Sequence, residues 1–366
     1  MTHTYTFAMA TVTGIVLMPF VAGATPISRM HASGVITNNI ATMQHNIMLN
    51  AFDNFDGTAA VTMGNYLRMT PEPETNVPLC QPVYGITYCD GDIYGDNSTA
   101  LSSGRSGGET NVLGYDWLDW HHAQDKAKFD GFDKIDSDYD LITLGFAGDP
   151  KEISGGFSQS GGFGGLALAR EKNDDVKLTE NGGFVGLYRG YHVNGFNITG
   201  AADLGVLFSD VKSALGDKDD TTNLWAGIAM NVSYNIMLNE TLTLQPGVYG
   251  GYTWIHSSGY ETTTGTDLDI DNNAHMFEVA PSLRAIASMD NDIYTIATVR
   301  YVANFTSGGN ITIAGNTITE LEMKDYFEYG LSIEKDIERF NMSASIYRHD
   351  GGRTGWSGGV QLRYIF

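Results

Sequence analysis

The sequence predicts an antiparallel β-barrel that spans a membrane, built from the C-terminal two-thirds of the chain. Three observations predict this fold class. Long segments alternate apolar and polar side chains, which is the period of a strand between two different environments. Glycine (44) and tyrosine (19) are abundant, whereas proline (9) is scarce. Beyond residue 24, no segment has about 18 continuous apolar residues, so strands must do any spanning of a membrane.

The last segment, residues 354–366, shows the alternation most clearly. Its even positions from 356 onward are apolar, aromatic or glycine: Trp356, Gly358, Val360, Leu362, Tyr364 and Phe366. Its odd positions are mostly small or polar: Gly355, Ser357, Gly359, Gln361, Arg363 and Ile365. The same pattern recurs upstream, for example over residues 327–334 and 277–285. One face of each predicted strand therefore suits lipid and the other a polar interior.

A soluble β-sandwich would also alternate, and three features weigh against it. Tyrosine and phenylalanine gather near strand ends, as the interfacial girdles of a membrane barrel require. The polar face carries charges in mid-strand, such as Glu278 and Arg284, which suits a watery lumen. The predicted strands are about 10 residues or longer, whereas strands of globular proteins usually have about 5–6.

The alternation predicts twelve strands. Their connections mostly alternate between short turns, such as Asn194-Gly195, and long loops, such as His256 to Asn273. The connection from His349 to Arg353 is short where a long one is expected. An even number of strands puts both ends of the barrel on the periplasmic side. The expected strands are residues 111–122, 138–147, 153–170, 183–193, 196–209, 221–235, 241–255, 274–288, 292–305, 325–335, 339–348 and 354–366.

Residues 1–24 are predicted to be a signal peptide that directs export. Phe7 to Val21 form an apolar core of the right length, and Ala22-Gly23-Ala24 is a small-residue cleavage site. The segment before the core has no lysine or arginine, which departs from the usual pattern. The alternative is a membrane anchor, against which Pro19 and the short apolar run both count. Cleavage is expected before Thr25.

Residues 25–109 form a short N-terminal segment before the predicted barrel, residues 110–366. A helix near residues 35–56 is predicted because apolar residues recur at helical spacing: Ile36, Ile40, Met43, Ile47, Ala51 and Phe55. The other face is polar but uncharged: Asn38, Asn39, Thr42, Gln44, Asn46 and Asn50. Such a helix suits a plug in a polar lumen, and the alternative is a periplasmic arm. The rest of the segment is rich in proline and is predicted to be irregular.

Cys80 and Cys89 are the two cysteines of the chain. In an oxidising compartment they are predicted to form a disulfide that closes a small loop. The alternative is a pair of metal ligands, but no further cysteine or close histidine completes a tetrahedral set.

The formal net charge of −22 excludes nucleic acid as a partner, because phosphate binding needs clustered lysine and arginine. Much of the acid lies in the loops between predicted strands. There, Asp267, Asp269 and Asp271 are weak candidates for a calcium site, and divalent cations would bridge such loops to lipopolysaccharide phosphates. The glycine and distal glutamate of an EF-hand loop are missing, so a solvated acidic loop is favoured.

Catalysis would need a histidine near a carboxylate and a nucleophile. His121 and His122 follow two aspartates at the end of the first predicted strand, and His349-Asp350 lies in the last loop. Such pairs arise by chance in an acidic chain, and no nucleophile is identifiable. The chain is therefore expected not to be an enzyme, and no cofactor is expected.

Three places resemble the C-terminal β-domain of autotransporters, the type V secretion proteins. The segment Gly186-Leu187-Tyr188-Arg189-Gly190-Tyr191, with residues 196–210, is similar to the family's G-L-Y-x-x-Y … G … D pair of strands. Residues 139–146 and 161–169 resemble its early hairpin. The end, from Gly355-Trp356 to Phe366, is similar to its G-W … G-L-R-Y-x-F terminus. The resemblance covers roughly residues 110–366.

The resemblance implies an outer-membrane barrel that translocates or displays a short N-terminal segment at the cell surface. It also implies that Leu362, Tyr364 and Phe366 are the signal read by the barrel assembly machinery, although these residues equally suit simple contact with lipid. Lipid and lipopolysaccharide of the outer membrane are the other expected partners. Because the passenger would be tiny, two alternatives stay open. One is a porin-like channel favouring cations, and the other is a surface adhesion or structural barrel acting through acidic loops.

Overall fold

A computed structural model gives the fold of the chain. The described part comprises residues 34–53, 55, 81–83, 86–89, 92–94, 114–128, 134–154, 156–172, 176–213, 218–258, 268–270, 273–289, 292–309, 311–313, 316–319 and 323–365. Residues 34–53 form a helix, called the lumen helix below. No helix among the described residues is long and apolar enough to cross a membrane.

Twelve long strands dominate the described residues. They are β4 (Tyr115–Ala127), β5 (Ile135–Ala147), β7 (Gly156–Lys172), β8 (Val176–Val193), β9 (Phe196–Ser213), β10 (Lys218–Tyr234), β12 (Leu242–Ser258), β14 (Asn273–Met289), β15 (Ile293–Gly308), β18 (Tyr326–Ile337), β19 (Phe340–Gly351) and β20 (Arg353–Ile365). The short strands β6 (Lys151–Ile153) and β11 (Ile236–Met237) extend this sheet. A separate small sheet consists of β1 (Gln81–Val83), β2 (Ile86–Cys89) and β3 (Asp92–Tyr94). A second small sheet consists of β13 (Leu268–Ile270), β16 (Ile311–Ile313) and β17 (Asn316–Thr319).

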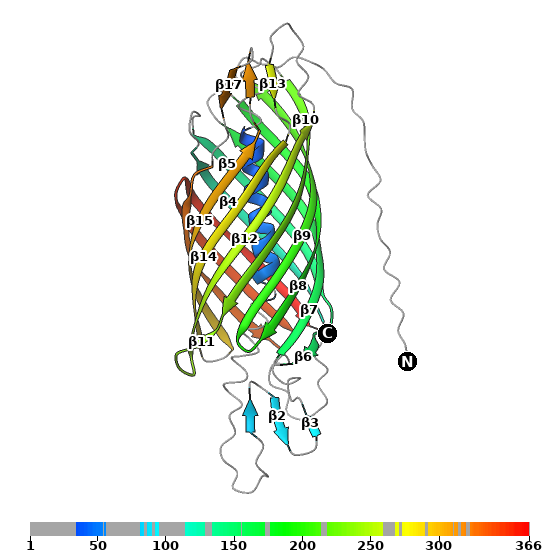
Figure 1. The fold of residues 1–366 in the computed structure, drawn as a ribbon, viewed down its shortest axis with the longest axis vertical. Coiled ribbons are helices and arrows are strands. Elements are labelled where there is room, and N and C mark those ends of the chain that lie inside the picture. Colours follow the sequence, from blue (N-terminus) through cyan, green and yellow to red (C-terminus); the bar gives the residue numbers. More distant parts are fainter. Residues whose placement is uncertain are drawn as a thin grey trace, which may run out of the picture.

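The twelve strands close into an antiparallel barrel (Figure 1). Each strand pairs with its neighbours in sequence, and closure comes from the pairing of the last strand, β20, with the first, β4. This seam runs in unbroken register from Arg353 opposite Ala127 to Ile365 opposite Tyr115. A closed sheet has no free edge, so the backbone polar groups of the wall are paired within the sheet, as lipid demands.

The prediction of twelve strands and of the helix is confirmed, but several strand ends differ from expectation. The first strand runs over residues 115–127 rather than 111–122. The long loop expected from Glu171 to Asn181 shrinks to residues 173–175, because β7 and β8 continue as a paired ladder. The loop expected from Val211 to Asp220 shrinks likewise to residues 214–217. These strand ends are polar and stand beyond the apolar band, so hydropathy does not mark them as strand.

The two ends of the barrel differ in their connections. At the end where β4 starts and β20 finishes, turns are short, and Asn194 (φ 50°) and Gly195 (φ 86°) form a two-residue hairpin with both residues left-handed. At the opposite end lie β13, β16 and β17 (Figure 1). Short turns mark the periplasmic end of bacterial barrels, so the end bearing β13, β16 and β17 is the outer end.

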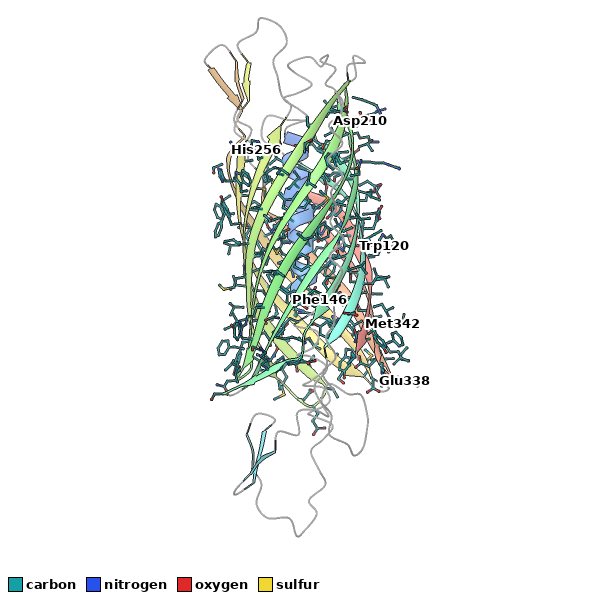
Figure 2. All side chains as sticks on the ribbon, turned by 90° about the vertical axis from the view of Figure 1, so that its right-hand side faces the viewer. Trp120, Phe146, Asp210, His256, Glu338 and Met342 are labelled. Carbon is teal, nitrogen blue, oxygen red and sulfur yellow. The ribbon has the colours of Figure 1, made fainter. Side chains whose placement is uncertain are left out.

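The outward face of the wall carries a broad apolar band. Large apolar side chains are exposed all along it, up to 68% for Leu187, and Figure 2 shows Trp120, Phe146 and Met342 between Asp210 at one end and Glu338 at the other. Exposed aromatic residues lie near both limits of the band. They are Phe146, Phe196, Tyr234, Phe340 and Tyr364 towards the periplasm, and Trp120, Phe208, Phe305, Phe327 and Trp356 towards the outside. Lipid contact accounts for this otherwise costly exposure.

Candidate functional site

The lumen helix lies inside the barrel, along its axis (Figure 1). All its residues are buried except Asn50 and Asp53, which are half-buried. The apolar face predicted from the sequence is enclosed, with Ile36, Ile40 and Met43 each 0% exposed, and so is the polar face. The helix is therefore a plug within the lumen, and the alternative of a periplasmic arm is wrong.

The helix runs from the outer end of the barrel to the periplasmic end. The Nδ2 atom of Asn39 donates to Glu180, close to the outer start of β8. Sixteen residues later, Phe55 lies against Gly190, close to the periplasmic end of the same strand. Within its described residues, the helix thus begins towards the outer end of the barrel and ends towards the periplasmic end.

The polar face of the helix is bonded to the wall at almost every turn. Gln44 Oε1 accepts from Thr253 at 2.8 Å, and His45 Nδ1 lies 3.0 Å from Glu278 Oε2. Asn46 Nδ2 donates to the hydroxyl of Tyr139 at 2.6 Å. Further contacts near the periplasmic end join Asn50 to Asp119 at 2.8 Å and Asp53 to Arg284 at 3.4 Å. These bonds use strands from around the barrel, so they fix both the depth and the rotation of the helix.

Aromatic side chains hold the periplasmic half of the helix. The ring of Phe52 lies 5.9 Å from that of Tyr249, and the ring of Phe55 lies 5.9 Å from that of Phe157. Phe55 also fills the space over Gly190, where an added Cβ would lie 2.4 Å from its ring. Glycine at this position is what lets the ring approach the wall.

We expect Gly190→Leu to push the Phe55 ring from its seat and to lower the free energy of unfolding by about 2–3 kcal/mol, the burial of one large side chain. Urea unfolding in detergent micelles, followed by tryptophan fluorescence, measures this. In a Phe55→Ala background the same leucine fills vacated space and should cost far less. Gly200→Leu is the matched control, because a Cβ there meets nothing nearer than 3.9 Å. Equal losses at both glycines would contradict the assigned contact.

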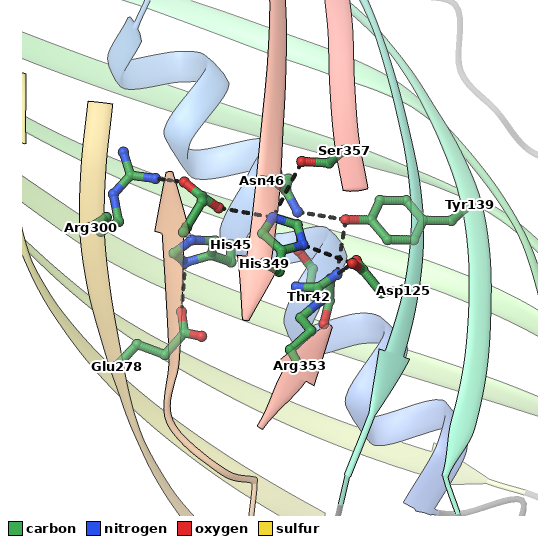
Figure 3. A network of polar contacts seen from close by, with 11 residues as sticks. Thr42, His45, Asn46, Asp125, Tyr139, Glu278, Arg300, His349, Arg353 and Ser357 are labelled. Carbon is green, nitrogen blue, oxygen red and sulfur yellow. Dashed lines mark hydrogen bonds and ion pairs between the residues drawn. The ribbon is translucent and has the colours of Figure 1, made fainter. Parts of the chain in front are cut away.

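A network of buried charged side chains lies on the inner face of the barrel wall, beside the helix (Figure 3). Asp125 on β4 forms an ion pair with Arg353 at 2.5 Å and a hydrogen bond with His349 Nδ1 at 2.7 Å. The other ring nitrogen of His349 lies 3.3 Å from Glu328, which is paired in turn with Arg300. Each of these side chains is buried, and each charge has an opposite partner, as burial requires.

Ser357, His349 and Asp125 are in the order of a hydrolytic triad, with Ser357 Oγ 3.3 Å from His349 Nε2. The surroundings of His349 do not support hydrolysis by these three residues. Glu328 also faces that nitrogen at 3.3 Å, so both ring nitrogens are best used as donors to carboxylates. A ring that donates from both nitrogens has no lone pair to accept the serine proton. The arrangement joins strands rather than activating a nucleophile.

Most of the candidate residues taken from the sequence lie where the structure describes no side chain. Leu362 and Tyr364 are exposed on the outward face, 36% and 38%, whereas Phe366 is outside the described residues. Asp267, Asp271 and Cys80 are outside them too. Asp269 and Cys89 fall in β13 and β2, where the backbone alone is described. The assembly signal, the calcium site and the disulfide therefore stay predictions.

The neighbouring histidines of β4 face opposite sides of the wall. His121 is buried in the lumen and stacks on Tyr139, whereas His122 is half-exposed outside. His122 Nδ1 lies 3.2 Å from Asp140 and 4.0 Å from Asp138, and together the three offer ligand atoms within 4.8 Å of one another. Sequence reasoning missed this group, because the register between β4 and β5 brings it together. His349 and Asp350 also diverge, since Asp350 faces outward to Tyr329.

Little free space remains between the helix and the wall on one side. A cavity of about 50 Å³ lies there, lined by residues that include Asn50, Asp119 and Arg300. That volume holds a few water molecules at most. The lumen at this level is filled by protein rather than by an open channel.

Comparison with known proteins agrees with this architecture. The family model "Autotransporter beta-domain" matches residues 117–346, more than half of the chain. Among solved structures, the β domain of the Bordetella autotransporter BrkA is similar at 18% identity and TM-score 0.56, covering 69% of this chain and 100% of that one. The transport unit of AIDA-I from Escherichia coli is similar at 16% identity and TM-score 0.55, with 74% and 96% covered.

The translocator domain of NalP from Neisseria meningitidis is also similar, at 12% identity and TM-score 0.54, with 70% and 89% of the two chains covered. At these identities the structures establish the fold alone. No curated protein matches the chain in sequence. The family match covers most of the barrel wall, from β4 to β19. The chain belongs to the autotransporter β-domain family and is an outer-membrane β-barrel of autotransporter type.

Proposed function

We propose that this barrel translocates and displays a very short N-terminal segment and then stays plugged by the lumen helix. The observation that carries the proposal is the direction of the helix, with Asn39 at the outer end and Phe55 at the periplasmic end. With the signal peptide cleaved before Thr25, residues 25–33 would be left at the cell surface. Residues 56–113 would lie on the periplasmic side, because β4 also begins there.

Under this proposal the displayed segment is residues 25–33 and not the whole of residues 25–109. A tiny surface segment needs no β-helical stalk, and a plug held by several polar contacts suits a barrel that acts once and then closes. The proposal includes assembly by the barrel assembly machinery through Leu362, Tyr364 and Phe366, contact with lipid and lipopolysaccharide, and no enzymatic activity.

Labelling with a membrane-impermeant maleimide on intact cells tests the proposal. In a background with Cys80 and Cys89 replaced by serine, Ser28→Cys is expected to be labelled on intact cells. Asn97→Cys should be labelled only after the outer membrane is permeabilised. Protease shaving of cells carrying the unmodified chain, read by mass spectrometry, gives the same answer without substitutions.

Either of two labelling results would contradict the proposal. Labelling of Asn97→Cys on intact cells would put residues 56–113 outside. Failure to label Ser28→Cys on intact cells, with labelling after permeabilisation, would mean that no segment is displayed. A porin-like channel is the second candidate, and the ion conductance of the intact barrel addresses it.

A further inference from the structure

Lysines line up across the outer ends of β7, β8, β9 and β10. The register puts Lys172 opposite Lys177, Lys177 opposite Lys212, and Lys212 opposite Lys218. Like charges directly opposite one another in neighbouring strands repel and destabilise a sheet. Such a row is stable where an anion lies over it.

The protein's own carboxylates only partly neutralise this region. Asp136 serves two lysines, at 3.2 Å from Lys126 and 4.0 Å from Lys172, and Asp210 lies 3.2 Å from Lys212. In the described part of the chain, Lys177 has no carboxylate within 4.0 Å. The side chain of Lys172 is 65% exposed. Arg348 is paired with Asp350 at 3.3 Å, so among the described residues Arg170 and Lys177 are the cations of this surface that have no carboxylate partner within 4.0 Å.

A hollow of about 910 Å³ opens on this surface. Five of its lining residues are cations: Lys126, Arg170, Lys172, Lys177 and Arg348. Against them, two outward carboxylates line it, Asp136 and Asp138, whereas Asp125 and Glu171 are buried on the lumen side. Trp356, also in the lining, lies under the Arg348 guanidinium at 5.1 Å and adds an apolar wall.

The height of the cations relative to the lipid band indicates what they meet. Along β7, Leu168 is exposed in the apolar band, and the next two outward residues are Arg170 and Lys172. At about 3.3 Å per residue, Lys172 is roughly 13 Å further along the tilted strand than Leu168. That level is the headgroup region of the outer leaflet, where basic side chains attract anionic lipid.

We propose that this surface, defined by Lys126, Arg170, Lys172, Lys177 and Arg348, binds the phosphorylated headgroup of an outer-leaflet glycolipid of the lipid A class. The lysines act as point charges for its phosphates, and the hollow and Trp356 receive its sugar and upper acyl carbons. The inference rests on the outer-membrane location and not on the display of residues 25–33, so either can fail without the other.

The test uses the full barrel purified in detergent and stripped of lipid, with bis-phosphorylated lipid A as the probe and native mass spectrometry as the readout. We expect a stoichiometric complex with the unmodified chain. The variant Arg170→Gln/Lys172→Gln/Lys177→Gln should bind about 100-fold more weakly, since each interfacial cation is worth about fivefold. Mono-phosphorylated lipid A should bind more weakly than the bis-phosphorylated form.

The matched control is Lys151→Gln/Arg189→Gln/Lys335→Gln, which removes three exposed cations at the periplasmic end. It should bind like the unmodified chain, and heat-modifiable migration on gels verifies that both variants are folded. Equal binding by the two triple variants would overturn the proposal. So would displacement of the lipid by millimolar inorganic phosphate, which would mark a site for free anions.

Discussion

Replacing residues 34–53 by a glycine-serine linker of equal length is expected to turn a nearly closed barrel into an open pore. The helix fills the lumen and is bonded to strands around the wall, from Glu180 to Glu278. Without it, water and ions replace the plug along the whole axis. Conductance in planar bilayers should rise by more than about tenfold, because a barrel of this strand number encloses a wide lumen.

The open pore should favour cations. Of the lumen-facing groups that are buried in the described residues, the carboxylates outnumber the arginines. The carboxylates are Asp119, Asp125, Glu171, Glu180, Asp203, Glu278, Glu328 and Glu334, and the arginines are Arg300, Arg353 and Arg363. Reversal potentials in a salt gradient measure this selectivity. High conductance of the unmodified barrel would contradict the plug and would favour the porin-like alternative.

Arg353→Met is expected to be the most damaging single substitution in the wall. It leaves Asp125 buried, with its 2.5 Å partner gone, and removes the contact of the guanidinium with the hydroxyl of Tyr139 at 3.4 Å. Breaking a buried ion pair on one side typically costs about 3–5 kcal/mol. The free energy of unfolding in urea, measured in micelles, should fall by that amount.

Two further variants test whether the loss comes from the buried ion pair of Arg353 and Asp125. Arg348→Met removes an arginine whose side chain is 31% exposed and which pairs with Asp350 at 3.3 Å, so about 1 kcal/mol or less should be lost. Asp125→Asn added to Arg353→Met should recover part of the loss, because the buried carboxylate that has lost its guanidinium partner is then neutral. A loss below about 1 kcal/mol for Arg353→Met would show that water replaces the guanidinium without penalty.

Local pattern was enough to predict the barrel wall and the presence of the helix. Period-2 alternation over segments such as residues 354–366 reflects lipid on one side, and helical spacing from Ile36 to Phe55 reflects a face that must be enclosed. The ends of β7 to β10 escaped prediction because they project past the lipid, where ladder pairing rather than hydropathy holds them.

The polar network in the lumen was beyond prediction for a different reason. Asp125 and His349 are separated by 224 residues and meet because β4, β19 and β20 are neighbours in the closed sheet. Nothing near either residue in the sequence indicates its partner. The group of His122, Asp138 and Asp140 likewise depends on the register between two strands.

The seam between β4 and β20 has a consequence for the order of events during assembly. Asp125 belongs to the first strand, whereas His349 and Arg353 belong to the last two, so their ion pairs join opposite edges of the sheet. While the sheet is still open, these charges remain hydrated and apart. These ion pairs can therefore form only when the first and the last strand meet, and they then hold the seam of the closed barrel. A barrel whose first and last strands are apart lacks these ion pairs, so the two strands should separate in one cooperative step.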